Sequence, residues 1–210
     1  MTDFYHEGSR QLQDRFETRP LADRLAEAIV SPQISPEDKG FIEAQNMFFL
    51  ATVDNEGRPD CSYKGGSVGL VKVLDEQTLA FPSYDGSGMY LSAGNLLINP
   101  HVSLLFVDFQ RQARLRFHGT AVIQDNDPLL ENWPEAELIV RVKLRELFPN
   151  CPRYIHKMTL VEESTFVPKA HCETPAPAWK SLEVVADVLP PRDAHLAGNE
   201  QDAAAALNRD

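Results

Sequence analysis

The chain has 210 residues, of which 43% are hydrophobic and 24% are charged, and its formal net charge at pH 7 is −11. This is an ordinary globular composition, and the length suits one domain with a sizeable core and short appendages. No run of eighteen or more apolar residues occurs, which excludes a membrane-spanning helix. The excess of acids, with no basic stripe to offset it, argues against nucleic acid as a partner.

The first sixteen residues are polar and include acids, so we expect neither a secretory signal nor a transit peptide there. Three cysteines, Cys61, Cys151 and Cys172, are far apart and form no CxxC pair. This argues against a disulfide framework and favours a reducing, cytoplasmic compartment. The triplet His171-Cys172-Glu173 resembles part of a metal site, but a zinc site needs further ligands at suitable spacing. The sequence offers none, so we expect no metal.

The first 45 residues are predicted to be helical. Leu21, Leu25 and Ile29 recur at helical spacing with charged residues between them. A second short helix is expected to start at Ser35-Pro36, because a serine cap, a proline in the first turn and the acids that follow are typical of a helix start.

Short apolar or alternating segments after residue 45 predict β-strands. The first is the continuous apolar run at 47–53, and a turn ending in Gly57 joins it to a second strand in a hairpin. The stretch from Pro82 to Gly88 is rich in turn residues and is predicted to be a loop, with a short helix after it that ends before Pro100. The remaining strands are expected at 58–64, 70–74, 78–81, 102–107, 114–123 and 138–145.

Two of these strands alternate between apolar and polar residues. Leu115 and Phe117 share one face of their strand, and Arg114, Arg116 and His118 share the other. The last strand alternates in the same way. Six or seven short, mostly antiparallel strands with turns between them favour a barrel over an open sheet.

The chain is expected to divide into three parts, a helical segment at 1–45, the barrel at 46–165 and a C-terminal extension at 166–210. Much of the extension is rich in proline and lacks periodicity, so we expect it to run extended along the surface. Its last residues, 199–210, are polar and rich in alanine, and their final turns are expected to fray.

Two segments could hold an anion. The Ser/Gly loop around Ser87 follows a strand and opens a helix, so its backbone N–H groups and hydroxyls could point at a phosphate; the alternative is a plain loop capped by Ser87. At Lys64-Gly65-Gly66 the glycines permit close approach of the backbone, and the lysine could neutralise a phosphate. The alternative there is a solvent-facing lysine at a turn.

Arg114, Arg116 and Arg153 could each either bind a ligand or have no role in binding. If the face of Arg114 and Arg116 lines a cleft, the two guanidinium groups can clamp an anion; otherwise they are solvated. After the last strand, Arg153, Tyr154 and His156 fall on what we predict to be one short helical turn, where they could cap a ring or hold a substrate anion. The alternative is a packed helix with Tyr154 and Ile155 buried. No arrangement typical of nucleophilic catalysis is visible.

Taken in order, several motifs resemble the pyridoxamine 5′-phosphate oxidase-like superfamily, and in particular its oxidase-related, FMN-binding branch. The resemblance covers roughly residues 40 to 160. The motifs are FFLATVD followed by GRPD at 48–60, KGG at 64–66, LAFP at 79–82, GNL and NP at 94–100, VSLLF at 102–106, RLRFHGTA at 114–121 and NCPRYI at 150–155.

The resemblance implies a mainly β fold with flanking helices, a six-stranded antiparallel split β-barrel that forms a homodimer with two FMN molecules at the subunit interface. It also implies where the cofactor binds. Lys64 would meet the phosphate or ribityl chain, and Ser87 the phosphate. The full set of cofactor-binding residues that it implies is Ser62, Lys64, Pro82, Ser83, Ser87, Asn95, Arg114, Arg116 and Arg153.

Three departures from the oxidases predict a different substrate. Ser92-Ala93-Gly94 takes the place of their Ser-Arg-Lys, Arg114-Leu115-Arg116 only loosely matches their Arg-Gln-Val-Arg, and their C-terminal Arg-x-His has no clear counterpart. We therefore expect an FMN-dependent oxidoreductase acting on another small molecule, with no assigned catalytic side chain. The alternatives are a non-catalytic flavin- or haem-binding protein and a deazaflavin-dependent reductase.

Overall fold

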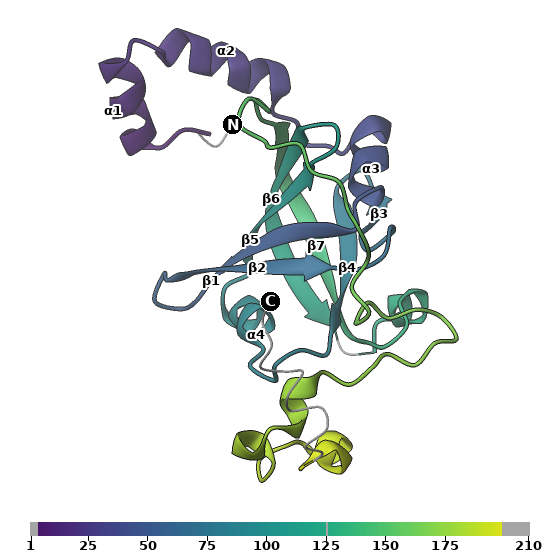
Figure 1. The fold of residues 1–210 in the computed structure, drawn as a ribbon. Coiled ribbons are helices and arrows are strands. Elements are labelled where there is room, and N and C mark those ends of the chain that lie inside the picture. Colours follow the sequence, from purple (N-terminus) through teal and green to yellow (C-terminus); the bar gives the residue numbers. More distant parts are fainter. Residues whose placement is uncertain (1–3, 125, 199–210) are drawn as a thin grey trace. The chain divides into compact units, whose positions relative to one another are not determined.

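The computed structural model describes residues 4–124 and 126–198 (Figure 1). The chain forms two compact units, Met1–Val161 and Glu162–Asp210. The segment 199–210, expected to fray, lies outside the described residues. In the part of the chain that the structure describes, no helix has the length and apolar character needed to cross a membrane.

Three helices precede the sheet, the two that were predicted and an additional one before them: α1 (Glu7–Arg15), α2 (Arg19–Ile29) and α3 (Pro36–Glu43). The predicted start of α3 is confirmed. The Ser35 hydroxyl accepts a hydrogen bond from the Asp38 backbone N–H, and the Asp38 carboxylate accepts one from the Ser35 backbone N–H. Two N–H groups that the helix leaves without an internal partner are satisfied in this way.

All strands pair antiparallel in one sheet, in the order β2-β1-β5-β6-β7-β4-β3. The six strands implied by the family resemblance are one too few, because the sheet has seven; the short edge strand that pairs with β4 was predicted from the sequence pattern at 70–74. The strands are β1 (Met47–Val53), β2 (Pro59–Gly65), β3 (Lys72–Asp75), β4 (Thr78–Tyr84), β5 (His101–Asp108), β6 (Ala113–Gln124) and β7 (Ala136–Pro149).

The predicted loop at Pro82 to Gly88 begins too early. Pro82 and Ser83 belong to β4 and pair with Ile139 and Leu138 of β7. On the other side of β4, β3 reaches only as far as Ala80. A proline is tolerated there because the strand has a free edge, where one missing N–H leaves no neighbouring carbonyl unpaired.

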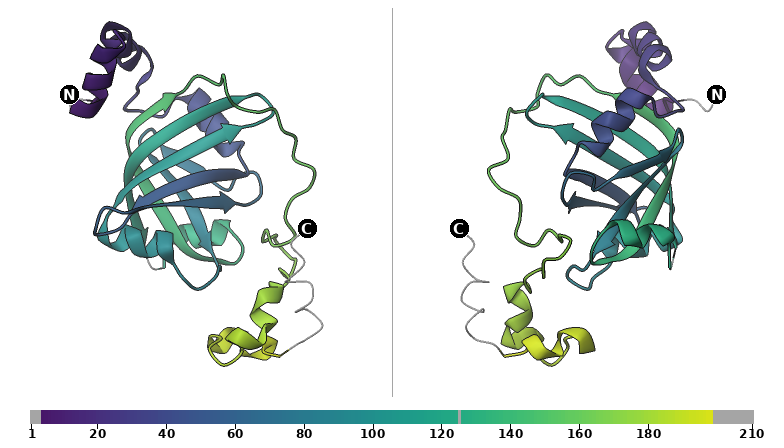
Figure 2. Two further views of the ribbon diagram at one scale, coloured as in Figure 1. Left: turned by 60° about the vertical axis from the view of Figure 1, so that its left-hand side comes forward. Right: turned by 90° about the vertical axis from the view of Figure 1, so that its right-hand side faces the viewer.

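The sheet curls around one core (Figure 2). The alternation predicted for β6 is confirmed, because Leu115 and Phe117 are buried inside the sheet while the arginines on the opposite face are half-buried. Phe48 of β1 and Phe81 of β4 meet at the centre, with their ring centroids 4.9 Å apart. The helix α4 (Leu91–Ile98) packs against β1, β2 and β6.

A register shift in the β6–β7 pairing lies at Gly119. A side chain at this position would collide with the backbone carbonyl of Lys143 on β7. Only glycine fits this close approach of two backbones, and the bulge bends the long β6–β7 pair so that the sheet can curl.

A buried ion pair attaches the segment before β7 to the outside of the sheet. Asp127 is 3% exposed and accepts hydrogen bonds of 2.6 and 2.8 Å from the guanidinium of Arg141. The short 3₁₀ helix η1 (Pro128–Asn132) follows Asp127 and leads to Trp133, which covers Ile139. This explains why Ile139, on the polar side of the alternation in β7, is fully buried.

The second unit contains three short 3₁₀ helices, η2 (Ala178–Ser181), η3 (Glu183–Val185) and η4 (Pro191–Leu196). The expectation of a purely extended segment is therefore wrong for this region. Lys180 is 4% exposed, and its ammonium group donates a 2.8 Å hydrogen bond to the carboxylate of Asp193, so that its buried charge is compensated.

The substitution Asp127→Asn should lower the free energy of unfolding by about 3 kcal/mol at pH 7, because it leaves the Arg141 guanidinium without its buried counter-charge. The hydrogen bonds from Arg141 hold the pKa of the Asp127 carboxyl below its usual value. The stabilisation is therefore complete above the unfolded-state pKa of about 3.9 and is lost as the pH falls through the lower folded-state value. Urea unfolding of both proteins at pH 7 and at pH 3 checks this. A gap between them that stays constant or widens at pH 3 would contradict it.

Candidate functional site

The candidate site is a pocket of about 210 Å³ at one end of the sheet. Three segments form its walls: the inner face of β2, the end of β4, and the connection that leads from β4 into α4. The lining residues are Ser62, Lys64, Ser83, Tyr84, Gly86, Ser87, Gly88, Met89, Tyr90, Leu91, Ser92 and Ala93.

The register of the β1–β2 hairpin turns Ser62 and Lys64 inward. They lie directly opposite Leu50 and Phe48, two of the most deeply buried core residues, and cross-strand neighbours share a face of the sheet. Burial lowers the pKa of the Lys64 ammonium group, and the nearby Asp60 offsets part of this effect. Lys64 forms no hydrogen bond or ion pair with any described residue. It is a half-buried cation without an acidic partner at contact distance.

The end of β4 supplies a protonated phenol. A register shift between Ser83 and Tyr84 marks the point where β4 leaves its regular pairing with β7. Burial, helped by the negative charge of Glu135, raises the pKa of Tyr84 to about 12. Tyr84 therefore keeps its proton at neutral pH and can donate a hydrogen bond into the pocket.

The third wall continues into the beginning of α4. Tyr90 takes the cap position in the left-handed conformation, with φ of 47°, and no side chain caps the helix. The hydroxyls of Ser62 and Ser92 lie 2.7 Å apart, which ties the first turn of α4 to β2. The first N–H groups of α4 and the positive end of its dipole thus lie beside Lys64 at the pocket.

Asn95 belongs to the support of the pocket. Its side-chain amide donates a 3.0 Å hydrogen bond to the hydroxyl of Thr52, which is fully buried on β1. Together with the Ser62–Ser92 contact, this bond fixes α4 to the first hairpin at two points.

Four of the nine sequence-predicted residues therefore line one pocket: Ser62, Lys64, Ser83 and Ser87. Pro82 is buried immediately before Ser83, and Asn95 is bonded to Thr52. The last three predicted residues do not line this pocket and are Arg114, Arg116 and Arg153.

Arg114 and Arg116 lie on the outer face of β6. The guanidinium of Arg114 donates a 2.8 Å hydrogen bond to the carbonyl of Cys151, and that of Arg116 lies 5.6 Å from the centre of the Phe148 ring. Burial lowers the pKa of Arg116, and the neighbouring Arg114 adds to this effect.

The predicted helical turn after β7 is wrong. The segment Cys151 to His156 contains a turn but no helix, and all of its residues except Ile155 are exposed; a segment this short has no packing to stabilise a helix. Tyr154 is 84% exposed, so the alternative of a buried tyrosine is also wrong. The backbone N–H of Arg153 bonds the Cys151 thiol and lowers its pKa.

Sequence reasoning missed Tyr84, Tyr90 and Ser92 as pocket residues. The turn residues at 82–88 predict a loop that includes Tyr84. Ser92 was noted only as a departure from the Ser-Arg-Lys motif. Its position two residues into a helix, next to a Ser/Gly-rich connection, was the available signal.

The pocket is suited to an anion. It gathers an unpaired ammonium, four serine hydroxyls, a protonated phenol and a helix N-terminus. These groups are hydrogen-bond donors of the kind that hold phosphates. Among the residues that the structure describes, no group of three or more His, Cys, Asp or Glu side chains comes together to hold a metal ion.

The substitution Asn95→Ala should lower the free energy of unfolding of the ligand-free protein by about 1–3 kcal/mol, because it leaves the buried Thr52 hydroxyl without its partner. Ser87→Ala, in the exposed loop, should change it by less than about 0.5 kcal/mol. Chemical denaturation of both variants in the absence of ligand makes the comparison. Equal stability of the two would show that Asn95 does not anchor α4.

Comparison with known proteins assigns the family. No curated protein matches the chain. Solved structures similar to it include HupZ from Group A Streptococcus (22% identity, 55% of this chain and 93% of that one, TM-score 0.45) and HutZ, a heme storage protein from Vibrio cholerae (22%, 55% and 94%, 0.41). Another is an FMN-binding protein from Syntrophomonas wolfei (13%, 67% and 97%, 0.40). The family model described as pyridoxamine 5′-phosphate oxidase matches residues 34–149, more than half of the chain, and the chain therefore belongs to the pyridoxamine 5′-phosphate oxidase family.

Proposed function

We propose that this protein binds FMN, with the phosphate of the cofactor in the pocket beside Lys64, and that it acts as an FMN-dependent oxidoreductase on a small molecule. The observation that supports this most directly is the combination of Lys64 with the uncapped start of α4 in one pocket of a chain of this family. Lys64 would pair with the phosphate, and Ser62, Ser87 and Ser92 would donate hydrogen bonds to it.

The chemistry of the residues present fits a phosphate. A half-buried ammonium without an acidic partner is unfavourable in the free protein, and a dianion at this place would compensate its charge. The N–H groups at the start of α4 have no side-chain cap to satisfy them. A phosphate would compensate the charge of Lys64 and also accept hydrogen bonds from the N–H groups at the start of α4.

The size of the pocket supports a site completed by a second copy of the chain. Sites that enclose a whole cofactor or drug-sized ligand typically have volumes of roughly 300–1,000 Å³. The pocket, at about 210 Å³, is large enough for the phosphate end of FMN and leaves the flavin ring uncovered. A homodimer with the cofactor at the interface would cover the ring.

The outer face of the sheet offers a surface for this second copy. Five residues of neighbouring strands, from β2 through β1, β5 and β6 to β7, lie side by side on this face. We call them the outer row: Tyr63, Phe49, Leu105, Arg116 and Phe148. Tyr63 is 63% exposed, and Phe49 and Leu105 are only half-buried. These three residues form the exposed apolar part of the outer row, and an exposed apolar stretch on a sheet is typical of a surface that is covered in an assembly.

The outer row also gives a role to the predicted arginines outside the pocket. Arg116 is a member of the outer row, and Arg114 lies two residues before it on the same strand face. In the proposed dimer both would face the second copy, where their charges could contact the cofactor from its open side. We assign Arg153, on the exposed turn after β7, to the same side.

FMN, when bound, supplies the transfer of hydride or single electrons, so the protein needs no catalytic acid–base pair of its own. The side chains of this chain would bind and orient the cofactor. Tyr84, protonated up to a pH of about 12, would donate a hydrogen bond to the bound molecule and would not act as a base. The three departures from the oxidase motifs support a substrate other than pyridoxamine 5′-phosphate.

The first test is titration of the protein with FMN, followed by absorbance and flavin fluorescence. Lys64→Met should weaken FMN binding at least ten-fold, because it removes the cation that pairs with the phosphate. The same variant should bind riboflavin, which has no phosphate, within about two-fold of the unmodified protein. Lys157→Met, which removes an exposed lysine outside the pocket, serves as the matched control and should bind both ligands normally.

Three outcomes would contradict the proposal. An equal loss of FMN and riboflavin binding would mean that Lys64 does not contact the phosphate. A purified protein that shows a haem absorption band and no affinity for FMN would make it a haem-binding protein. A tightly bound flavin that reductants bleach but no substrate reoxidises would leave binding without the oxidoreductase activity.

The homodimer has a separate test. Sedimentation at micromolar concentration should give about twice the monomer mass of 23.5 kDa, and Tyr63→Glu should weaken the dimer at least ten-fold by placing a charge in the outer row. Val68→Glu, another exposed apolar position outside the outer row, is the control. A monomer of unmodified protein that still binds FMN tightly would contradict the interface site.

A further inference from the structure

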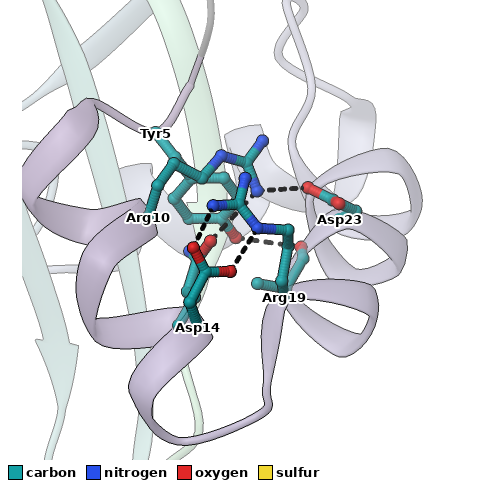
Figure 3. A network of polar contacts seen from close by, with 7 residues as sticks. Tyr5, Arg10, Asp14, Arg19 and Asp23 are labelled. Carbon is teal, nitrogen blue, oxygen red and sulfur yellow. Dashed lines mark hydrogen bonds and ion pairs between the residues drawn. The ribbon is translucent and has the colours of Figure 1, made fainter.

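Most arginines of this acidic chain are paired with carboxylates. The two N-terminal helices show the usual arrangement (Figure 3). The guanidinium of Arg10 pairs with Asp23, and that of Arg19 forms two hydrogen bonds with Asp14. Because the chain has 31 acidic and 20 basic residues, a carboxylate is available to almost every cation.

Three neighbouring arginines form an exception. Arg114, Arg116 and Arg153 have no carboxylate at ion-pair distance among the residues that the structure describes. Glu146, on the same face of β7 as the arginines of β6, is bound to Arg145 instead, at 2.8 Å. Unpaired cations that lie close together in a chain with excess acid form a local positive field, which attracts anions.

The three guanidinium groups lie around the turn that follows β7, and we call them the arginine cluster. Arg114 donates a 2.8 Å hydrogen bond to the carbonyl of Cys151. The backbone N–H of Arg153 lowers the pKa of the Cys151 thiol, and the charges of Arg153 and Arg114 lower it further, so both guanidinium groups lie near this thiol. Burial lowers the pKa of Arg116, and repulsion by Arg114 adds to this effect. Arg114 is therefore close to both other members of the cluster.

Two buried polar atoms at this place have no hydrogen-bond partner. They are Nε of Arg114 and Oδ1 of Asn150, and the described part of the chain contains no other buried side-chain nitrogen or oxygen in this state. The two residues are neighbours, because the backbone N–H of Asn150 donates a 3.5 Å hydrogen bond to the carbonyl of Arg114. Such atoms are rare in native structures, and a functional role or a bound water or ion is a common reason for them.

We propose that the arginine cluster is a second anion site, which binds the carboxylate or phosphate group of a small molecule. Neighbouring guanidinium groups repel one another unless an anion compensates their charge, and they bind both kinds of group through paired hydrogen bonds. The site is distinct from the pocket at Lys64, which none of the three arginines lines.

The cluster belongs to one copy of the chain, so the anion site does not depend on the homodimer. In the homodimer proposed above, the cluster would lie on the open side of the flavin, and the bound anionic group would belong to the substrate. This consequence alone rests on the proposed function.

The exposed thiol of Cys151 allows a direct test, because it lies beside two members of the cluster. The ligand-free protein is alkylated with iodoacetate, which carries a carboxylate, and in parallel with the neutral iodoacetamide. Mass spectrometry gives the rate at each cysteine. The ratio of the iodoacetate rate to the iodoacetamide rate should be at least five-fold higher at Cys151 than at Cys61 and Cys172, which are also exposed. A lowered thiol pKa raises both rates alike, so the ratio isolates binding of the carboxylate.

Three variants locate the site. Arg153→Gln, at an exposed position, should reduce the ratio at Cys151 to that at Cys61. Arg24→Gln, which removes an exposed arginine of α2, is the matched control and should leave the ratio unchanged. Lys64→Met should also leave it unchanged, because Lys64 belongs to the other site.

Inorganic phosphate is the second probe. At about 10 mM it should slow the reaction of iodoacetate with Cys151 at least five-fold, in the unmodified protein and in Lys64→Met alike. Sodium chloride of equal ionic strength should slow it by less than two-fold, because screening weakens any exposed charge without occupying a site.

Several results would overturn the second anion site and leave FMN binding at Lys64 intact. These are equal ratios at the three cysteines, an equal effect of phosphate and sodium chloride, or protection by phosphate that is lost in Lys64→Met. An unreactive Cys151 in the unmodified protein would mean that the cluster is covered, and would overturn the site as well. Loss of FMN binding in Lys64→Met with an unchanged ratio at Cys151 would support both proposals.

Discussion

The pairing of β7 with two strands at once is the constraint on which the rest of the structure depends. One edge of its fourteen residues pairs with β6 and the other with β4. Without the pairing of β7 with β6, the sheet would not continue past β6. Without the pairing of β7 with β4, the end of β4 would have no fixed position opposite β2. The bulge at Gly119 and the Asp127–Arg141 ion pair both act on β7, the first by bending it and the second by holding the segment that leads into it.

The alternation of side chains along a strand lets β2 serve two purposes. Ser62 and Lys64 point into the sheet and line the pocket, while Tyr63, between them, points outward and begins the outer row. Three consecutive residues of this edge strand thus contribute to the pocket with one face and to the outer row with the other. A shift of one residue in the β1–β2 register would exchange the two faces and destroy both.

Much of the fold could be predicted from the sequence because its signals are local. The serine cap of α3, the turn at Gly57 and the alternation of β6 each depend on a few neighbouring residues. The errors arose where distant residues decide the outcome. Pro82 reads as a loop signal, but it is tolerated in β4 because β3 is short, and Ile139 is buried because Trp133, from a segment before β7, covers it.

The same distinction applies to the site. Lys64 and Ser87 can be proposed as anion ligands from residue type and their neighbours alone, and the structure places both in the lining of one pocket. The direction in which Arg114 and Arg116 point could not be read from the sequence, because alternation defines two faces without saying which one encloses the core. Tyr84 was missed because its role comes from a register shift against β7, a property of two strands together.

The position of β2 at the end of the strand order has a consequence for the lifetime of any complex. β2 pairs only with β1, and none of its residues is fully buried. Edge strands of this kind open locally at a small fraction of the free energy needed to unfold the whole protein. Since two of the side chains proposed to bind the ligand, Ser62 and Lys64, are on this strand, a bound molecule would be able to leave when β2 frays while the core stays folded. The residence time of the molecule would then depend on how often β2 opens locally. A bound molecule would in turn slow this opening, because it contacts side chains of the strand.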